Sequence, residues 1–177
     1  MGKGNYVLHT IKLKSKDLRG LCNHNERRKT ENSSNPDIQR DLTSLNYELH
    51  RDTDKKIDYE NDVKALISER YEGRKLRENT TFAVSFNISS GKEFFEGMSQ
   101  EREREFFQAN YDLIEEKYGK ENIISARVHK DEETPHMHLV LVPFTQDNRL
   151  SAKELFDRGN LRELQDCALK LQEKGFD

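Results

Sequence analysis

The chain has 177 residues, which is enough for one domain with its own core and short for two. It is polar, with 36% charged residues, but its nine Phe and six Tyr occupy patterned positions, so a disordered chain is excluded. No segment approaches the roughly 20 apolar residues that span a bilayer, and the first residues lack the apolar core of a secretory signal. The composition therefore predicts a cytoplasmic protein with no membrane segment in this domain.

The net charge of −3 is unevenly distributed. The first 30 residues carry eight basic side chains against two acidic ones. Because distant surface charge is screened within roughly 8–10 Å, a basic region on an acidic body can still bind a phosphate backbone. Charge alone is equally consistent with a solvated surface. If the partner is DNA, we expect Lys12, Lys14 and Lys16 to contact its phosphates.

The N-terminal half is predicted to contain one strand and two helical segments. Residues 6–13 are rich in residue types that favour strands. Residues 15–29 are predicted to form a helix or a loop, with Ser15 as the capping residue, and the polar residues 30–37 a surface loop. A helix is predicted over about 55–77, where apolar residues recur at helical spacing: Ile57, Val63, Leu66, Ile67 and Tyr71.

The C-terminal half has clearer patterns. Residues 80–89 alternate as in a strand, with Phe82, Val84, Phe86 and Ile88 on one side. A long helix should follow Ser99 and end at Gly119, burying Phe107, Tyr111, Ile114 and Tyr118. Residues 123–129 and 136–143 predict two antiparallel strands, and a last helix covers about 160–174 and ends at Gly175. The predicted fold class is α+β, a central antiparallel sheet with flanking helices. We expect residues 1–177 to form a single domain cut from a longer protein.

Half of the six histidines lie within ten residues, at positions 129, 136 and 138. His136 and His138 share one face of a strand because side chains at i and i+2 point the same way. If the two strands pair, His129 arrives beside them from the end of the preceding strand. Three imidazoles leave open positions on a metal ion, as catalytic sites do. The alternative, three hydrogen-bonded core or surface histidines, explains this dense spacing poorly.

Neutral imidazoles leave a bound cation its full positive charge, which suits an anionic substrate such as a phosphodiester. We predict a divalent metal, Mn²⁺ first, with Mg²⁺, Zn²⁺, Co²⁺ and Ni²⁺ as alternatives. Asp131 and Glu132, between the histidines, are placed to orient a ligand or a nucleophile. The alternative is that they are ordinary acids of a solvated turn.

Other titratable residues are less informative. His24, followed by Arg27 and Arg28, could be a phosphate contact, a nucleophile or part of a solvated helix surface. Tyr47 could be a nucleophile or simply half-buried. His9 and His50 are isolated, and we predict structural roles for both. Cys22 and Cys167 have no metal-binding spacing and are predicted to be reduced thiols.

Several short motifs occur in a specific order: HNER at 24–27, NYEL at 46–49, HKDEETPHMH at 129–138, VPF at 142–144 and RLSAKELFD at 149–157. With them, the sequence resembles the Mob/Pre (MobV-type) family of bacterial plasmid mobilisation relaxases, in the HUH endonuclease superfamily. The resemblance spans nearly the whole chain. It implies metal-dependent nicking and strand transfer at a plasmid origin of transfer, in conjugative mobilisation or plasmid recombination.

The resemblance also implies residue roles. His24 would be the nucleophile, leaving a 5′-phosphate bound to the protein and a free 3′-OH. Glu132, with Asp131 beside it, would orient this nucleophile, while Arg27, and with it Arg28 and Tyr47, would contact DNA. The implied partner is single-stranded or supercoiled origin DNA, with a homodimer and a coupling protein engaged through a further C-terminal region.

Two alternatives stay open. A rolling-circle replication initiator shares the metal-binding strand but normally uses a tyrosine nucleophile, and the HNER motif argues against it. A non-catalytic origin-binding protein would have no need of an open metal site.

Overall fold

The chain folds around one five-stranded antiparallel sheet with the strand order β1-β3-β5-β4-β2. The computed structural model describes residues 5–28, 36–52 and 57–175, so Lys3, Lys29, most of the predicted loop at 30–37 and the predicted start of the second helix lie outside the described residues. The strands are β1 (Val7–Leu13), β2 (Tyr47–Glu48), β3 (Ala83–Ser89), β4 (Ile123–His129) and β5 (His136–Leu141). The predicted α+β class with a central antiparallel sheet is confirmed.

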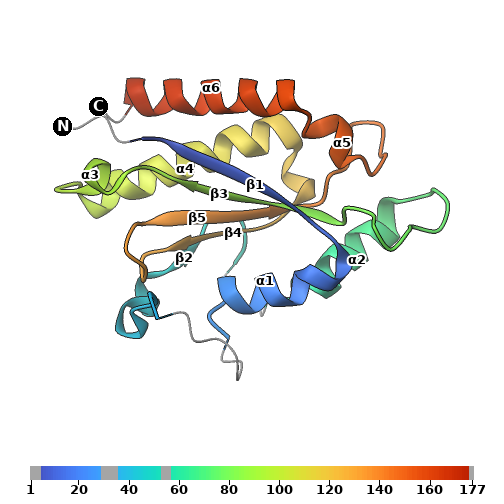
Figure 1. Ribbon diagram of the computed structural model, residues 1–177, viewed down its shortest axis with the longest axis horizontal. Coiled ribbons are helices and arrows are strands. Elements are labelled where there is room, and N and C mark those ends of the chain that lie inside the picture. The colour runs from blue at the N-terminus through green and yellow to red at the C-terminus, as the bar shows by residue number, and fades with distance from the viewer. Residues whose placement is uncertain (1–4, 29–35, 53–56, 176–177) are drawn as a thin grey trace.

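Helices cover both faces of the sheet (Figure 1). One face carries α4 (Gln100–Tyr118) and α6 (Arg158–Gly175), and the other carries α1 (Leu18–Asn25) and α2 (Tyr59–Arg70). Because alternate strand residues point to opposite faces, each layer has its own apolar core. Phe86 and Leu139 belong to the core under α4, and Val140 belongs to the core under α1 and α2.

The long helix α4 follows the prediction closely. The Ser99 hydroxyl caps it by accepting a hydrogen bond from the Arg102 amide at 3.2 Å. Phe107, Tyr111, Ile114 and Tyr118 are all buried. Gly119 ends the helix with φ +87°, a conformation that other residues rarely adopt. The last helix also ends at Gly175 as predicted.

Three local predictions were wrong. Ser15 does not cap α1, because it begins a short 3₁₀ turn (Ser15–Asp17) and Asp17 occupies the capping position of α1. The second helix is shorter than predicted. Asp58 caps it, and it ends at Arg70 because the backbone of Tyr71 is extended. Phe82 precedes β3 and packs against the core under α1 and α2, not with Phe86.

Short elements had no periodic signal in the sequence. These are β2, α3 (Lys92–Phe95), α5 (Ala152–Leu155) and the 3₁₀ turns η1 (Ser15–Asp17), η2 (Arg40–Leu45) and η3 (Lys120–Asn122). A segment of two to six residues is too short to show helical or strand periodicity. Within the described ranges, no helix is both long and apolar enough to cross a membrane.

Candidate active site

The pairing of β4 with β5 brings the three predicted histidines together. His129 lies directly opposite His136 in the register, and His138 lies between Asn87 on β3 and Arg127 on β4. The three ring centroids are 4.9–5.2 Å apart in pairs. All three residues lie on the sheet face that α1 and α2 cover, so the strand alternation anticipated from the sequence is correct for this cluster.

Hydrogen bonds fix two of these rings. The Nε2 of His129 lies 2.9 Å from the Asn25 carbonyl oxygen, and the Nδ1 of His136 lies 2.9 Å from the Thr134 carbonyl oxygen. A carbonyl only accepts, so each of these ring nitrogens carries the proton and the other one keeps its lone pair.

The two lone-pair nitrogens, Nδ1 of His129 and Nε2 of His136, face each other at 3.4 Å. Two acceptors gain nothing from this approach unless a cation lies between them. Two imidazoles bound to one tetrahedral ion at about 2.1 Å would also be separated by about 3.4 Å. The residues present therefore fit a metal ion.

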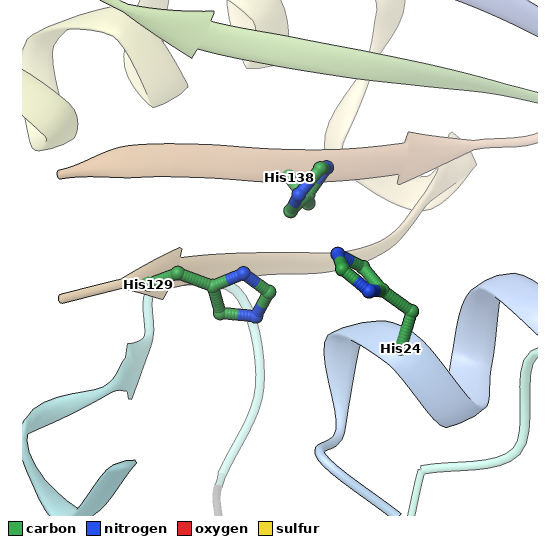
Figure 2. Close-up of side chains that lie close together, drawn as sticks. All are labelled: His24, His129 and His138. Carbon is green, nitrogen blue, oxygen red and sulfur yellow. The ribbon is translucent and has the colours of Figure 1, made fainter. Parts of the chain in front are cut away.

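His24 joins this cluster from the last turn of α1. Figure 2 shows its ring turned toward those of His129 and His138, with centroid distances of 5.8 and 5.5 Å. Two overlapping sets have ligand atoms within 4.8 Å of one another: His24 with His129 and His138, and His129 with Glu132 and His136. The predicted trio is thus divided between these two sets, and both His24 and Glu132 lie close enough to take part.

The imidazoles of His24, His129 and His138 are held in the neutral form. Burial, followed by the nearby Arg27 charge, lowers the pKa of His129 to about 3. Burial is also the main reason that the pKa of His138 lies well below its ordinary value and that the pKa of His24 is lowered. At neutral pH these rings therefore offer lone pairs to a cation or to an electrophile.

Arg27 ties the end of α1 to the loop between the histidines. Its backbone has φ +50°, which is unusual for a residue with a side chain. Its guanidinium binds both carboxylate oxygens of Asp131, at 2.9 and 2.6 Å, and Glu132 at 2.5 Å. The Arg27 side chain is 8% exposed and that of Asp131 is fully buried. Burial opposes ionisation of Asp131, but hydrogen bonds from Arg27, Thr43 and Asn46 lower its pKa.

Several residues that were predicted to contact DNA or to orient a ligand have other contacts in the structure. Arg27 is occupied by two carboxylates, and Asp131 has no exposed surface with which to meet a substrate. The Arg28 guanidinium donates to the Ile57 carbonyl oxygen. Glu132 lies 3.8 Å from the facing nitrogens of both His129 and His136, close to where a metal would bind.

Tyr47 lies on the opposite side of the sheet. It pairs with Val128 of β4, packs against the core under α4 and has the Arg104 guanidinium 4.7 Å from its ring centroid. The geometry therefore does not support direct contact of Tyr47 with the histidine cluster.

The three lysines that were predicted to contact DNA are divided between two places. Alternation along β1 places Lys12 on the α4 side of the sheet with Leu8, whereas Lys14 and Lys16 line a separate cleft at the start of α1.

A buried chain of hydrogen bonds starts at Asn25, the residue whose carbonyl oxygen holds the His129 ring. The Asn25 side chain bonds to the Tyr59 hydroxyl at 3.1 Å, Tyr59 to Ser125 at 3.2 Å, and Ser125 to Glu48 at 2.8 Å. This network links α1, α2, β4 and β2 beneath the carbonyl that holds His129. Buried hydrogen bonds of this kind fix the arrangement of the elements they join, although the Asn25 Oδ1 atom has no hydrogen-bond partner among the described residues.

Sequence reasoning missed Asn87 and Ser89. Both line a cavity of about 700 Å³ together with His24, His136 and His138. The Asn87 Oδ1 atom is buried, and it has no hydrogen-bond partner among the residues that the structure describes. Their signal was present in the sequence, since Ser85, Asn87 and Ser89 are polar at alternate positions of an otherwise apolar strand.

Removing the Asp131 carboxylate should destabilise the fold. Asp131→Ala leaves the Arg27 charge partly uncompensated in the interior, and we expect a loss of about 3–5 kcal/mol in the free energy of unfolding. Urea denaturation measures this. The matched control is Glu154→Gln, which breaks an exposed ion pair with Arg149 and should leave stability nearly unchanged. Equal stability of both variants would contradict a clamping role for the Arg27–Asp131 pair.

An antiparallel sheet that presents histidines from two adjacent strands, with a further histidine over them from a helix, is the arrangement of a metal-binding domain. The chain belongs to the Mob_Pre family, described as plasmid recombination enzyme, whose model matches residues 3–177. The predicted resemblance is therefore confirmed.

Relatives and solved structures agree with this membership. The chain is 40% identical over 172 residues to a plasmid recombination enzyme of Bacillus thuringiensis, covering 97% of this chain and 38% of that protein. It is 40% identical over 161 residues to a plasmid recombination enzyme type 2 of Staphylococcus aureus, covering 90% and 37% of the two chains. The chain thus spans less than half the length of these relatives.

Two solved structures of the MobM relaxase domain, bound to plasmid pMV158 oriT DNA and to manganese, are similar to this chain. One matches with a TM-score of 0.86 and 36% identity, and another, with a 3′-thiophosphate on the DNA, with 0.88 and 38%. Both cover 98% of this chain and 88% of the other. Manganese in these neighbours agrees with the metal that the sequence predicted first.

Proposed function

We propose that this chain nicks one strand of DNA at a plasmid origin of transfer and transfers that strand, through a phosphate held covalently on His24. The observation that carries the proposal is the position of His24, a neutral imidazole next to two histidines whose lone pairs face a common point. The MobM domain, which shares the fold at 36–38% identity, is described with oriT DNA bound. This supports an origin strand as substrate.

His129, His136 and His138 are the residues that would hold the metal. His129 and His136 have their second ring nitrogens anchored by backbone carbonyls. His138 has no such anchor among the described residues, but its strand is paired on both sides, with Asn87 of β3 and Arg127 of β4, which fixes its backbone. His24 lies outside the sheet on the last turn of α1, with no ring hydrogen bond in the described ranges, so its ring is the one best placed to approach phosphorus. A divalent cation bound there would stabilise the negative charge that develops on the phosphoryl oxygens.

The reaction proposed for His24 is a reversible substitution at phosphorus. A lone-pair nitrogen of His24 attacks the scissile phosphate, forming a P–N bond while the P–O3′ bond breaks. The leaving oxygen takes a proton from solvent and becomes the free 3′-OH, and the 5′-phosphate stays on the protein. The reverse attack by a 3′-OH reseals a strand and frees His24.

A tyrosine nucleophile, as in a rolling-circle initiator, finds no support in the geometry. The described residues include all six tyrosines, and each one packs in or against one of the two cores: Tyr6, Tyr47, Tyr59, Tyr71, Tyr111 and Tyr118. None of them lines the cavity that His24, His136 and His138 share. The histidine therefore remains our proposed nucleophile.

Cleavage of the pMV158 oriT strand tests the proposal against a purely DNA-binding role. We expect nicking of this single strand in buffer with Mn²⁺ and none after chelation of divalent metal. Tight DNA binding with no cleavage under both conditions would favour a non-catalytic origin-binding protein. Homodimer formation, contact with a coupling protein and a region beyond residue 177 stay predictions.

DNA binding should depend strongly on salt through Lys14 and Lys16. Each phosphate contact with single-stranded DNA adds about 0.7 to the log–log salt slope, so Lys14→Ala/Lys16→Ala should flatten it by about 1.4. Fluorescence anisotropy at several salt concentrations measures the slope. Lys12→Ala is the matched control, because Lys12 points toward the other face of the sheet. A larger effect of Lys12→Ala than of the double variant would move the DNA path to that face.

A further inference from the structure

Strand β1 carries a strip of exposed side chains beside the histidine cavity: Val7, His9 and Ile11, here called the β1 strip. Val7 is 44% exposed and Ile11 is 52% exposed, so two apolar side chains of one strand face are open to solvent. Leu8 belongs to the core under α4, so the strip faces the other way, toward the side of the histidines. In the described sheet β1 is an edge strand that pairs only with β3.

One end of the strip reaches the candidate active site. Val7 lies opposite Ser89 and His9 lies opposite Asn87 in the β1–β3 register. Ser89 and Asn87 line the cavity of His24, and Val7 lines it too. The strip is therefore continuous with the place where we propose that the scissile phosphate binds.

The other end of the strip leads to a basic cleft. Past Leu13 the chain continues into Lys14 and Lys16. The charged residues that line a cleft of about 680 Å³ here are four basic ones and two acidic ones: Lys14, Lys16, Arg19, Arg77, Glu60 and Glu78. Arg19 pairs with Glu60 at 3.0 Å, but Lys14, Lys16 and Arg77 form no ion pair with any described residue. At about 3.3 Å per residue, Val7 and Lys14 are about 23 Å apart, a distance that several nucleotides can span.

An apolar strip between an anion-binding site and a cationic cleft matches the chemistry of single-stranded DNA. Proteins that bind single strands combine cations for the backbone with side chains, mostly aromatic, on which unpaired bases stack. The β1 strip offers the His9 ring and two branched apolar side chains for this contact. A duplex keeps its base faces stacked inside and would leave the strip uncovered. We propose that the β1 strip holds the unpaired bases of the strand that enters the histidine cavity, and that the cleft of Lys14 and Arg77 binds its phosphates further along. This assignment rests on the proposed function.

The test compares the binding of a DNA strand that has bases with the binding of a strand that lacks them. Binding of dT20 and of a 20-mer made only of abasic deoxyribose phosphates is measured by anisotropy for the wild type and for Val7→Thr/Ile11→Thr. Threonine keeps the branched shape that suits a strand and removes apolar surface. We expect the wild type to prefer dT20, and the double variant to lose about five- to tenfold in affinity for dT20 but little for the abasic chain. The matched control is Leu169→Gln on α6, where Leu169 is 41% exposed, and it should bind as the wild type does.

Two results would overturn the assignment. Equal affinity of the wild type for both 20-mers shows that no base is contacted, and this comparison holds even if the variant folds poorly. Sedimentation that shows a wild-type dimer and a monomeric double variant would make the strip an interface between two copies. Cleavage of the pMV158 oriT strand by the wild type is followed in parallel, so that failure of the proposed nicking is told apart from failure of the strip.

Discussion

Replacement of His136 by Ala is expected to abolish metal-dependent nicking while leaving the fold intact. The Nε2 of His136 faces the Nδ1 of His129 at 3.4 Å, and its other nitrogen is held by the Thr134 carbonyl. Disturbing a group that only orients a ligand costs 10–100-fold in metal affinity, so loss of the ligand itself should cost more than about 100-fold. Without a firmly bound cation we expect the nicking rate to fall by about 10²–10³.

Calorimetric titration with Mn²⁺ and cleavage of an oriT strand measure these two losses. His50→Gln is the matched control, because His50 bonds to Tyr111 on α4 and lies apart from the cluster. We expect His50→Gln to bind Mn²⁺ as the wild type does. Full cleavage by His136→Ala in Mn²⁺ buffer would contradict the assignment of His136 as a ligand.

The second large effect is expected for His24→Ala, which should bind Mn²⁺ and DNA but form no covalent adduct. The His24 side chain meets the cluster from α1, and no carbonyl among the described residues anchors its ring. Its removal takes away the attacking nitrogen without disturbing the anchored pair of His129 and His136. Denaturing gels after incubation with an oriT strand show whether a protein–DNA band forms.

Metal binding separates the two roles open to His24. If His24 were a ligand, as its distance from His129 and His138 permits, His24→Ala would lose Mn²⁺ affinity as His136→Ala does. Normal Mn²⁺ affinity with no adduct is the result that the nucleophile role requires.

The sequence predicted those parts of the site that depend on local spacing. The i, i+2 positions of His136 and His138 determine a shared face, and a six-residue connection between two strands makes pairing with His129 the natural arrangement. Strand β3 and helix α4 were predicted for the same reason, because their apolar periodicity extends over enough residues to be read.

Long-range contacts were not predictable in this way. Arg27 and Asp131 are 104 residues apart, and nothing local indicates that one neutralises the other in the interior. Tyr47 lies on a strand of two residues, too short for its face to follow from a pattern. Alternation alone would place Lys12 and Lys14 on one face, but β1 ends at Leu13, and this strand end appears only in the folded chain.

The covalent adduct tests the central claim most directly. The chain is incubated with Mn²⁺ and a single-stranded oriT oligonucleotide, digested, and mapped by mass spectrometry before and after mild acid. We predict a 5′-phosphorylated fragment on the peptide that contains His24, lost in mild acid and stable to alkali, as expected of a P–N bond. An acid-stable adduct on Tyr47, or on any other tyrosine, would contradict the assignment of His24 as the nucleophile and would leave only the metal site supported.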